Sequence, residues 1–280
     1  MRRKLLILFV AFATAASAAG AAHAASGATI APEVSSNWSG YAAIASDSTV
    51  PTSFTDVTGT WVQPRATCTA GRASSSAFWV GIGGYDDTSR SLQQLGTGSD
   101  CSGDTTTPSY YAWWELVPAS AVRIKTLKVF PGDTITAAVL VDGQKITFSL
   151  RDLTRHARFS KVLTTAQRLD TGSAEWIAEA PSACSSFGRC RVVPLTNFGT
   201  VTFTNAAMIA NSRPGTLLGP TTPTGSSPWT MTPIELITGG DNRGFFGRVS
   251  SESGIGAVPG DLTADGRGFS VSWAKNLTAP

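Results

Sequence analysis

The strongest constraint in this sequence is the recurrence of short apolar runs between clusters of Gly, Pro, Asn and Asp. The runs are rich in β-branched and aromatic residues, a pattern typical of β-strands separated by turns. After the first 24 residues, no long segment has a helical period. The sequence therefore predicts an all-β fold, with strands over 57–62, 78–82, 92–95, 110–117, 122–129, 134–141, 145–150, 175–179, 200–204 and 269–273.

The clearest local unit covers residues 134–150, where Asp142 and Gly143 separate two apolar runs. An Asp-Gly pair accepts the positive φ angles of a tight hairpin turn, so the two flanking strands should be antiparallel neighbours. The segment 219–228, with its repeated Pro and Gly, indicates a surface loop within the domain.

The N-terminus has the three parts of a secretory signal. Met1 to Lys4 are mostly basic, Leu5 to Ala16 are apolar, and Ala22-His23-Ala24 offers a small-residue cleavage site. We expect residues 1–24 to be a signal peptide, 25–34 a short N-terminal segment, and 35–280 one domain. The remaining length, about 250 residues, suits a single all-β sandwich or barrel. The apolar run is too short and Ala-rich to predict a membrane span, so we expect a secreted, extracellular protein.

The charge balance argues against polyanionic partners. The full chain has 22 basic and 19 acidic residues. The signal segment contains three of the basic residues, which leaves 22 − 3 = 19 against 19. A balanced chain has no basic footprint for nucleic acid or for an anionic membrane. The charged fraction of 15% is below the usual quarter or so, which limits how many carboxylates an acidic medium must protonate.

Four cysteines in an exported chain predict two disulfides. Three pairings are possible, and sequence order favours Cys68 with Cys101 and Cys184 with Cys190. The spacing has no Cys-x-x-Cys pair, and His156 is the one histidine after residue 24. We therefore expect neither a zinc site nor another cofactor.

The common nucleophilic and metal mechanisms lack their residues. No Gly-x-Ser-x-Gly elbow, His-Glu-x-x-His pair or phosphate-binding loop occurs in the sequence. The segment 151–156 is typical of a polar turn, so His156 is expected to be a solvated loop residue. Carboxylate chemistry remains.

One short motif could mislead. The residues Asp170-Thr171-Gly172-Ser173 match the aspartic peptidase signature, in which two aspartates share a proton. A single chain needs a second copy, and none is present. We interpret Asp170 to Ser173 as a turn that leads into the next strand.

Several stretches of the chain carry a shared pattern. In order, they are Ser36-Asn37-Trp38-Ser39-Gly40, Phe78-Trp79-Val80-Gly81-Ile82-Gly83-Gly84, Gln94-Leu95-Gly96, Tyr111-Ala112-Trp113-Trp114-Glu115-Leu116-Val117-Pro118, Pro131-Gly132-Asp133, Ser173-Ala174-Glu175-Trp176-Ile177-Ala178-Glu179 and Phe198-Gly199-Thr200-Val201-Thr202-Phe203-Thr204. Each stretch alone is weak, whereas their shared order from about residue 35 to 205 is fairly specific. Together they resemble the eqolisins, or glutamic peptidases, and indicate a secreted member of bacterial type.

The resemblance implies a sandwich of two large, curved antiparallel sheets with the active site in the concave face of one. It places the catalytic glutamate at Glu175, the catalytic glutamine at Gln94 and a further glutamate at Glu115. The family tryptophan falls on Trp79. The family aspartate falls on Gly83, so its side chain is missing, and Asp86 or Asp87 is a candidate to replace it.

The chemistry of the pair agrees with peptide hydrolysis by a monomeric, acid-acting endopeptidase on protein or peptide substrates. Glu175 can take a proton from water and return it to the leaving nitrogen. Gln94 can donate a hydrogen bond to the oxyanion, a contact worth about 3 kcal/mol. A pKa for Glu175 near the reference value of about 4.3 would suit mildly acidic work.

Other interpretations stay open at this point. Glu175 could be an exposed strand carboxylate, Gln94 a solvated residue, and Glu115 a structural hydrogen-bond partner. Trp79 and Trp113 are more often core packing than substrate contacts. A glycosidase using Glu115 and Glu175 would need its carboxylates about 5–5.5 Å apart. A binding module could use the eight tryptophans as stacking surfaces.

Overall fold

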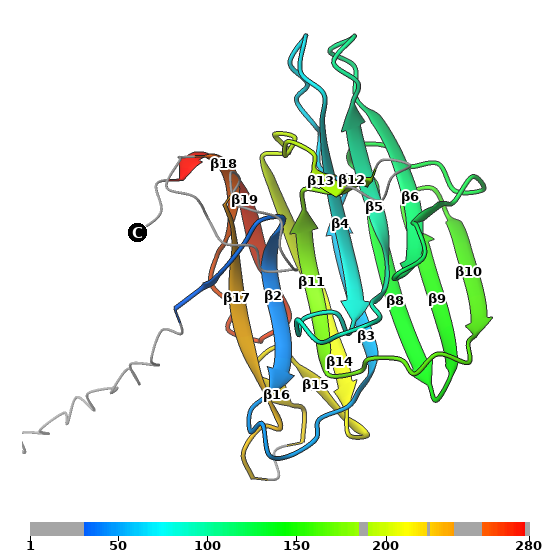
Figure 1. Ribbon diagram of the computed structural model, residues 1–280, viewed down its shortest axis with the longest axis vertical. Coiled ribbons are helices and arrows are strands. Elements are labelled where there is room, and N and C mark those ends of the chain that lie inside the picture. Colours follow the sequence, from blue (N-terminus) through cyan, green and yellow to red (C-terminus); the bar gives the residue numbers. More distant parts are fainter. Residues whose placement is uncertain (1–30, 185–189, 223–224, 238–253, 278–280) are drawn as a thin grey trace, which may run out of the picture.

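The computed structural model describes residues 31–184, 190–222, 225–237 and 254–277. Its strands form two layers (Figure 1), as the all-β prediction required. The first layer, in spatial order, contains β1 (Glu33–Ser35), β17 (Trp229–Ile237), β2 (Trp38–Ala45), β11 (Ser173–Glu179), β4 (Ser74–Ile82), β5 (Gln93–Cys101), β6 (Ser109–Leu116) and β7 (Val122–Arg123).

The second layer lies behind the first in Figure 1. In spatial order it contains β10 (Ala157–Thr164), β9 (Lys145–Asp152), β8 (Thr134–Asp142), β3 (Phe54–Val62), β14 (Thr200–Ala210), β19 (Phe269–Leu277) and β18 (Gly254–Pro259). Strands β15 (Arg213–Thr216) and β16 (Gly219–Pro220) extend from β14, and β12 (Ser182–Cys184) pairs with β13 (Cys190–Val192). All these pairings are antiparallel except that of β1 with β17. Two residue pairs between β17 and β18 join the layers.

The main core fills the space between the layers. Side chains alternate along each strand, so one face of each sheet supplies this core. Its aromatic contacts include Trp114 with Phe148, whose ring centroids are 5.5 Å apart. The buried indole of Trp176 donates to the Thr58 carbonyl at 2.8 Å. A Cβ at Gly59 would come within 2.9 Å of that indole, so the glycine leaves room for the ring.

Each predicted strand overlaps a strand of the structure, and one was too long. Strands β2, β10, β17 and β18 were not predicted, and Gly219 and Pro220 of the expected 219–228 loop form β16. Of the run 122–129, only Val122 and Arg123 form a strand. The apolar residues that follow, Ile124, Leu127 and Val129, are buried in the main core without forming a strand. The hairpin of β8 and β9 is confirmed, with Asp142 opposite Lys145 and Gly143 at φ 59°. Its turn residues are therefore 143 and 144, one position later than expected.

One predicted disulfide is present. Cys68 and Cys101 are bonded, which ties the loop after β3 to the end of β5. In the other predicted pair, Cys184 and Cys190 occupy opposite positions of β12 and β13, while their side chains lie outside the described part of the chain. The predicted signal, residues 1–24, also lies outside it. The described residues include no helix that could span a membrane.

Candidate active site

One row of residues crosses the first sheet from strand to strand. Glu175 of β11 is paired with Gly81 of β4, Gly81 with Gln94 of β5, and Gln94 with Glu115 of β6. Directly opposed residues on neighbouring strands point to the same face of a sheet. The two predicted catalytic residues therefore share one face, although 81 positions of sequence separate them (175 − 94 = 81). We call Glu175, Gly81, Gln94 and Glu115 the site row.

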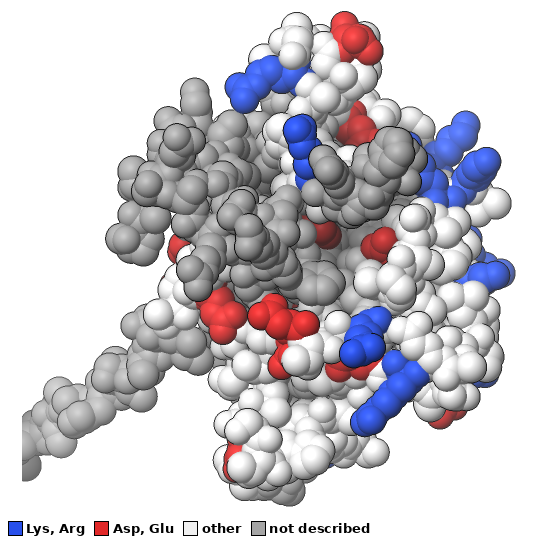
Figure 2. Space-filling view, in the orientation of Figure 1, with Lys and Arg blue, Asp and Glu red and all other residues white. Residues whose placement is uncertain are grey.

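The site row lies on the outer face of the first sheet, which is turned away from the second sheet. A second hydrophobic cluster covers this face, consisting of Trp38, Ala42, Ala77, Trp79, Leu92, Trp113, Ile177 and Ile234. The polar groups of the row are thus set in an apolar surface. Figure 2 shows patches of acidic surface near the middle of the same face of the molecule.

The glycine between Glu175 and Gln94 keeps the row open. Two strand spacings put the two Cα atoms about 9–10 Å apart, a gap that both long side chains can partly bridge. A Cβ at Gly81 would lie 2.9 Å from the Trp79 ring and 3.0 Å from Leu92. The indole and the leucine therefore form an apolar floor between the carboxyl and the amide.

Gln94 is oriented by the next residue of the row. Its Nε2 donates to Glu115 Oε2 at 2.7 Å, so Glu115 holds one N–H of the amide. Its Oε1 is buried and accepts no hydrogen bond from the described residues. Only 5% of Gln94 is exposed, so the interpretation as a solvated strand residue is wrong. One amide N–H and the carbonyl oxygen remain available to a substrate.

Glu175 is fully buried, with no hydrogen bond of ordinary length to either carboxylate oxygen among the described residues. Burial raises the pKa of this carboxyl well above its usual value; the Ser173 hydroxyl offsets part of the rise and the Asp170 charge adds to it. Two expectations are therefore wrong: Glu175 is not an exposed strand carboxylate, and its pKa is not near the reference value. The cause is desolvation, which penalises the charged form.

Glu179 is a site residue that the sequence interpretation missed. It lies two positions beyond Ile177 on the same face of β11. Its Oε2 accepts from Trp79 Nε1 at 2.7 Å, and its Oε1 accepts from the Asn37 amide at 3.1 Å. Burial, together with the Glu115 charge, raises the pKa of Glu179 to about 8. The strand alternation of Glu175 and Glu179 was the available signal.

The two predicted tryptophans both lie on the outer face. Trp79 is fully buried, and its ring packs at 76° against Trp38 with centroids 5.0 Å apart. Trp113 is 5% exposed, and its buried Nε1 has no hydrogen-bond partner among the described residues. Trp79 is therefore a fixed part of the floor, whereas the Trp113 indole keeps a donor free for a ligand.

The Asp170 motif is a turn, as predicted, and it leads directly into β11. The Asp170 carboxylate accepts from the Gly172 N–H at 2.8 Å and from the Gly84 N–H at 3.0 Å. Neither Asp86 nor Asp87 takes the place of the aspartate missing at Gly83. Both are exposed, and the Asp86 carboxylate accepts from the Thr88 N–H of its own loop at 2.7 Å.

Two residue types considered in the sequence, histidine and possible metal ligands, can be placed in the described structure. His156 is exposed in the turn between β9 and β10. In the described part of the chain, no group of three His, Cys, Asp or Glu side chains could hold a metal. The glycosidase alternative is also disfavoured, because Gly81 and Gln94 stand between Glu175 and Glu115. Three strand spacings separate the two glutamates by about 14 Å at their Cα atoms.

The comparisons with known proteins agree with the fold and the motif order. The chain matches the Peptidase A4 family over residues 36–234. A structure of scytalido-glutamic peptidase with a transition state analog inhibitor is 24% identical, covers 85% of this chain and 98% of that one, and has a TM-score of 0.63. SCP-B, an eqolisin in complex with the tripeptide Ala-Ile-His, is 23% identical over the same shares, with a TM-score of 0.59.

Aspergilloglutamic peptidase from Aspergillus niger is 22% identical, covers 72% of this chain and 99% of its own, and has a TM-score of 0.50. No curated protein sequence matches the chain. The family match covers most of the chain and confirms the eqolisin resemblance. The chain thus belongs to the Peptidase A4 family, the glutamic peptidases, and is a peptide hydrolase.

Proposed function

We propose that this protein is a secreted endopeptidase, active in acidic solution, in which Glu175 and Gln94 activate a water molecule against a peptide bond. One observation carries the proposal. Glu175 and Gln94 flank a glycine in a single row, and both have buried oxygen atoms that accept no hydrogen bond of ordinary length from the described residues. Buried polar atoms are nearly always satisfied, so unsatisfied ones that share a face indicate a ligand site.

The proposed reaction uses both groups of the pair. The ionised Glu175 carboxylate accepts a proton from water while the Gln94 carbonyl oxygen holds the same water. The hydroxide adds to the carbonyl carbon, and the free Gln94 N–H donates to the oxyanion that forms. Glu175 then returns its proton to the leaving nitrogen, the C–N bond breaks, and a carboxylic acid and an amine are released.

The raised pKa of Glu175 has two opposing effects on the rate. A smaller fraction of the enzyme has an ionised base in acid, but each ionised carboxylate is a stronger base. We expect the ascending limb of kcat/KM against pH to lie above 4.5, the usual pKa of a glutamate. The same burial favours the folded state in acid, because protonated carboxyls cost less to bury.

A peptide substrate suits the surroundings of the row. A cleft of about 900 Å³ opens beside Ser173 and Tyr85, at the Glu175 end of the row. Along β11 in the other direction, the outer-face cluster surrounds the row with the buried apolar side chains of Ile177, Trp79 and Trp113. The solved relatives carry peptide-based ligands, namely a transition state analog and a tripeptide.

The test is cleavage of an internally quenched peptide, blocked at both ends, between pH 3 and 8 with pepstatin present. Glu175→Gln should lower kcat by at least about 1000-fold, and Gln94→Ala by about 100- to 1000-fold, the usual cost of losing an oxyanion donor. Glu235→Gln, which changes a carboxyl outside the outer-face cluster, is the matched control. Full activity in either site variant rules the mechanism out. Complete inhibition by pepstatin would instead favour an aspartic mechanism at Asp170.

Export forms a separate part of the proposal. It rests on the basic, apolar and small-residue segments of positions 1–24. The amino-terminal sequence of protein recovered from the culture medium should begin near Ala25. Retention of Met1 in that protein contradicts a cleaved signal.

A further inference from the structure

The connection between β4 and β5 covers the Glu175 end of the site row. It runs from Gly83 to Leu92, and in Figure 1 it crosses in front of the lower end of β11. Tyr85 of this connection packs against the outer-face cluster. Its phenol interacts with Glu33 and Thr232, and its pKa is raised beyond the ordinary range by burial, by the Glu33 carboxyl and by the nearby Glu175 charge. The connection therefore places a hydroxyl-bearing ring beside the proposed base.

Asp170, which precedes β11, holds this connection through several contacts. One carboxylate oxygen, Oδ2, accepts from the Gly84 N–H at 3.0 Å and from the Ser89 hydroxyl. The Asp170 N–H donates to Ser91 Oγ at 2.7 Å. The amide group of Gln93 lies 3.0 Å from the same Ser91 hydroxyl. Asp170 is thus linked to both ends of the connection, including the residue that precedes Gln94.

Gly83 shows that this arrangement excludes a side chain at that position. A Cβ there would lie 2.5 Å from the Asp170 carbonyl oxygen and 3.0 Å from the Asp170 Cβ. Gly83 also has a φ of 80°, which glycine adopts without strain. Asp170 therefore occupies the space that a side chain at Gly83 would need. Its carboxylate reaches the turn from the segment that precedes β11.

We propose that Asp170 is a positioning residue of the Glu175–Gln94 pair, fixing the 83–92 connection so that Tyr85 lies beside Glu175 and Gln94 enters β5 in register. The inference rests on the proposed function. Asp170 acts in two ways: its hydrogen bonds hold the turn, and its negative charge faces Glu175. The other titratable groups near Glu175 are Tyr85 and, further along the face, Glu115 and Glu179. Arg90 and Arg168 are exposed and line the same cleft.

The experiment compares kcat, KM and the pH dependence of kcat/KM in Asp170→Asn and in the unaltered protein, using the blocked peptide above. Asparagine keeps the size of the side chain but removes the charge and one acceptor. We expect kcat to fall on the order of 10-fold or more through misplacement of the pair, with a smaller change in KM. Because the Asp170 charge raises the pKa of Glu175, its removal should also move the ascending limb to lower pH. Loss of a structural contact alone would not move that limb.

Two further variants make the outcome decisive. Ser89→Ala removes one hydrogen bond and keeps the Asp170 charge, so it should lower kcat and leave the limb in place. Asp87→Asn alters an exposed carboxylate of the same connection that does not line the cleft, and it should change neither quantity. A folded Asp170→Asn protein with an unmoved limb overturns the proposal. If that variant does not fold, unchanged kcat in Ser89→Ala overturns it instead.

The result can be separated from failure of the function itself. If Glu175→Gln and Gln94→Ala retain activity, the proposed function is wrong and Asp170 has no pair to position. If both variants lose activity while Asp170→Asn behaves like the unaltered enzyme, only the role of Asp170 is rejected.

Discussion

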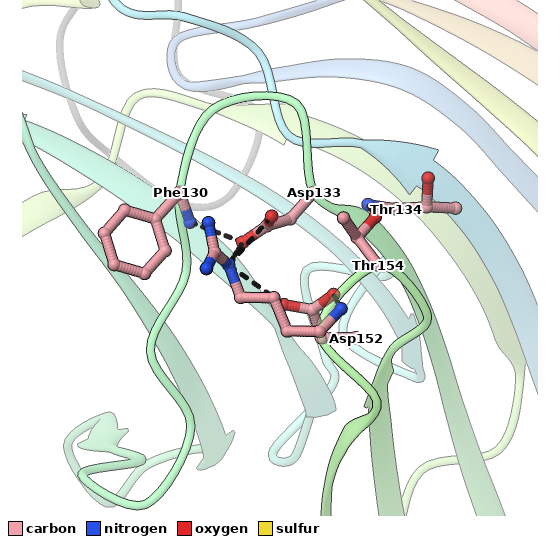
Figure 3. Close-up of polar contacts among 6 residues, drawn as sticks. Phe130, Asp133, Thr134, Asp152 and Thr154 are labelled. Carbon is pink, nitrogen blue, oxygen red and sulfur yellow. Dashed lines mark hydrogen bonds and ion pairs between the residues drawn. The ribbon is translucent and has the colours of Figure 1, made fainter.

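Two groups of buried carboxyls in this protein differ in whether a cation lies beside them. Asp133 and Asp152, at the ends of β8 and β9, are 2% and 1% exposed. Figure 3 shows these two carboxyls together with Phe130. The Arg155 Nε donates to Asp133 at 2.8 and 3.0 Å and lies 4.0 Å from Asp152 Oδ2, and the guanidinium lies 3.9 Å above the Phe130 ring. On the outer face of the first sheet, no described Lys or Arg forms an ion pair with Glu115, Glu175 or Glu179.

The difference separates structural carboxylates from reactive ones. Asp133 also accepts from the Phe130 N–H at 2.8 Å, so both of its carboxylate oxygens are hydrogen-bonded. These bonds tie the loop before β8 to the sheet. Glu175 has neither a cation nor a hydrogen bond of ordinary length in the described structure, and burial raises its pKa. An unsatisfied buried group costs stability, and such a cost is typical of groups that act on a ligand.

The sharpest test of this contrast is Glu175→Gln. It should lower kcat by at least about 1000-fold through loss of the base, equivalent to about 4 kcal/mol in the barrier. Its thermal stability at pH 7 should be equal or higher, because the variant no longer buries an unpaired ionisable group. Differential scanning calorimetry checks this. A strongly destabilised variant would show that Glu175 has a structural role, like Asp133.

Asp133→Asn should show the reverse. The substitution removes the charged partner of Arg155 and leaves buried donors imperfectly satisfied, which should cost about 1–3 kcal/mol of unfolding free energy. The lower end is expected because the Arg155 side chain is 46% exposed, and solvent screens the pair. Denaturant unfolding measures the loss, and kcat for the blocked peptide should stay unchanged. A large drop in kcat without a loss of stability contradicts a structural role.

The pH dependence of stability distinguishes the groups again. The pKa of Glu179 is about 8 in the folded protein against 4.5 for an ordinary glutamate, so between these values the folded state binds more protons than the unfolded state. Stability should therefore fall as pH rises through this range. Each 1 kcal/mol lost lowers Tm by about 2–4 °C in a domain of this size. Glu179→Gln should flatten the decline of Tm between pH 5 and 8, and an equally steep decline in that variant counts against the assignment.

The smallest expected effect concerns Trp113. Its buried Nε1 has no described partner, so Trp113→Phe removes a donor that no internal contact uses. Hydrogen bonds to neutral groups contribute about 0.5–1.5 kcal/mol, so KM should rise by roughly 2- to 13-fold if the indole donates to the substrate. Tm should change little. An unchanged KM would show that the indole only fills space.

Much of the fold could be predicted because strand alternation and turn residues are local properties. The run from Thr134 to Leu150 shows this, since its Asp-Gly pair and two apolar runs predict a hairpin from the local sequence alone. The run 122–129 fails for the opposite reason: its β-branched residues match a strand, but just two of them pair with β6. Strand β10, from Ala157 to Thr164, was missed because its polar, mostly exposed sequence lacks an apolar run.

The candidate site followed from motif order, but its electrostatics did not. Glu175 and Gln94 were identifiable as residues, and the Asp170 turn was identifiable by its missing second copy. The pKa of Glu175 depends on everything packed around the carboxyl, and the sequence contains no measure of that burial. Glu179 was passed over because its partner Trp79 is 100 positions away in the chain.

The sequence by itself determined the all-β class, the hairpin of β8 and β9, the Cys68–Cys101 pair and the residue types available for catalysis, because each follows from local pattern or composition. The tertiary structure alone decided that Gly81 separates Glu175 from Gln94, that Asp170 fills the place denied to a side chain at Gly83, and that Glu175 is buried without a cation. These features arise from strand register and burial, which join residues far apart in the chain and leave no local signature.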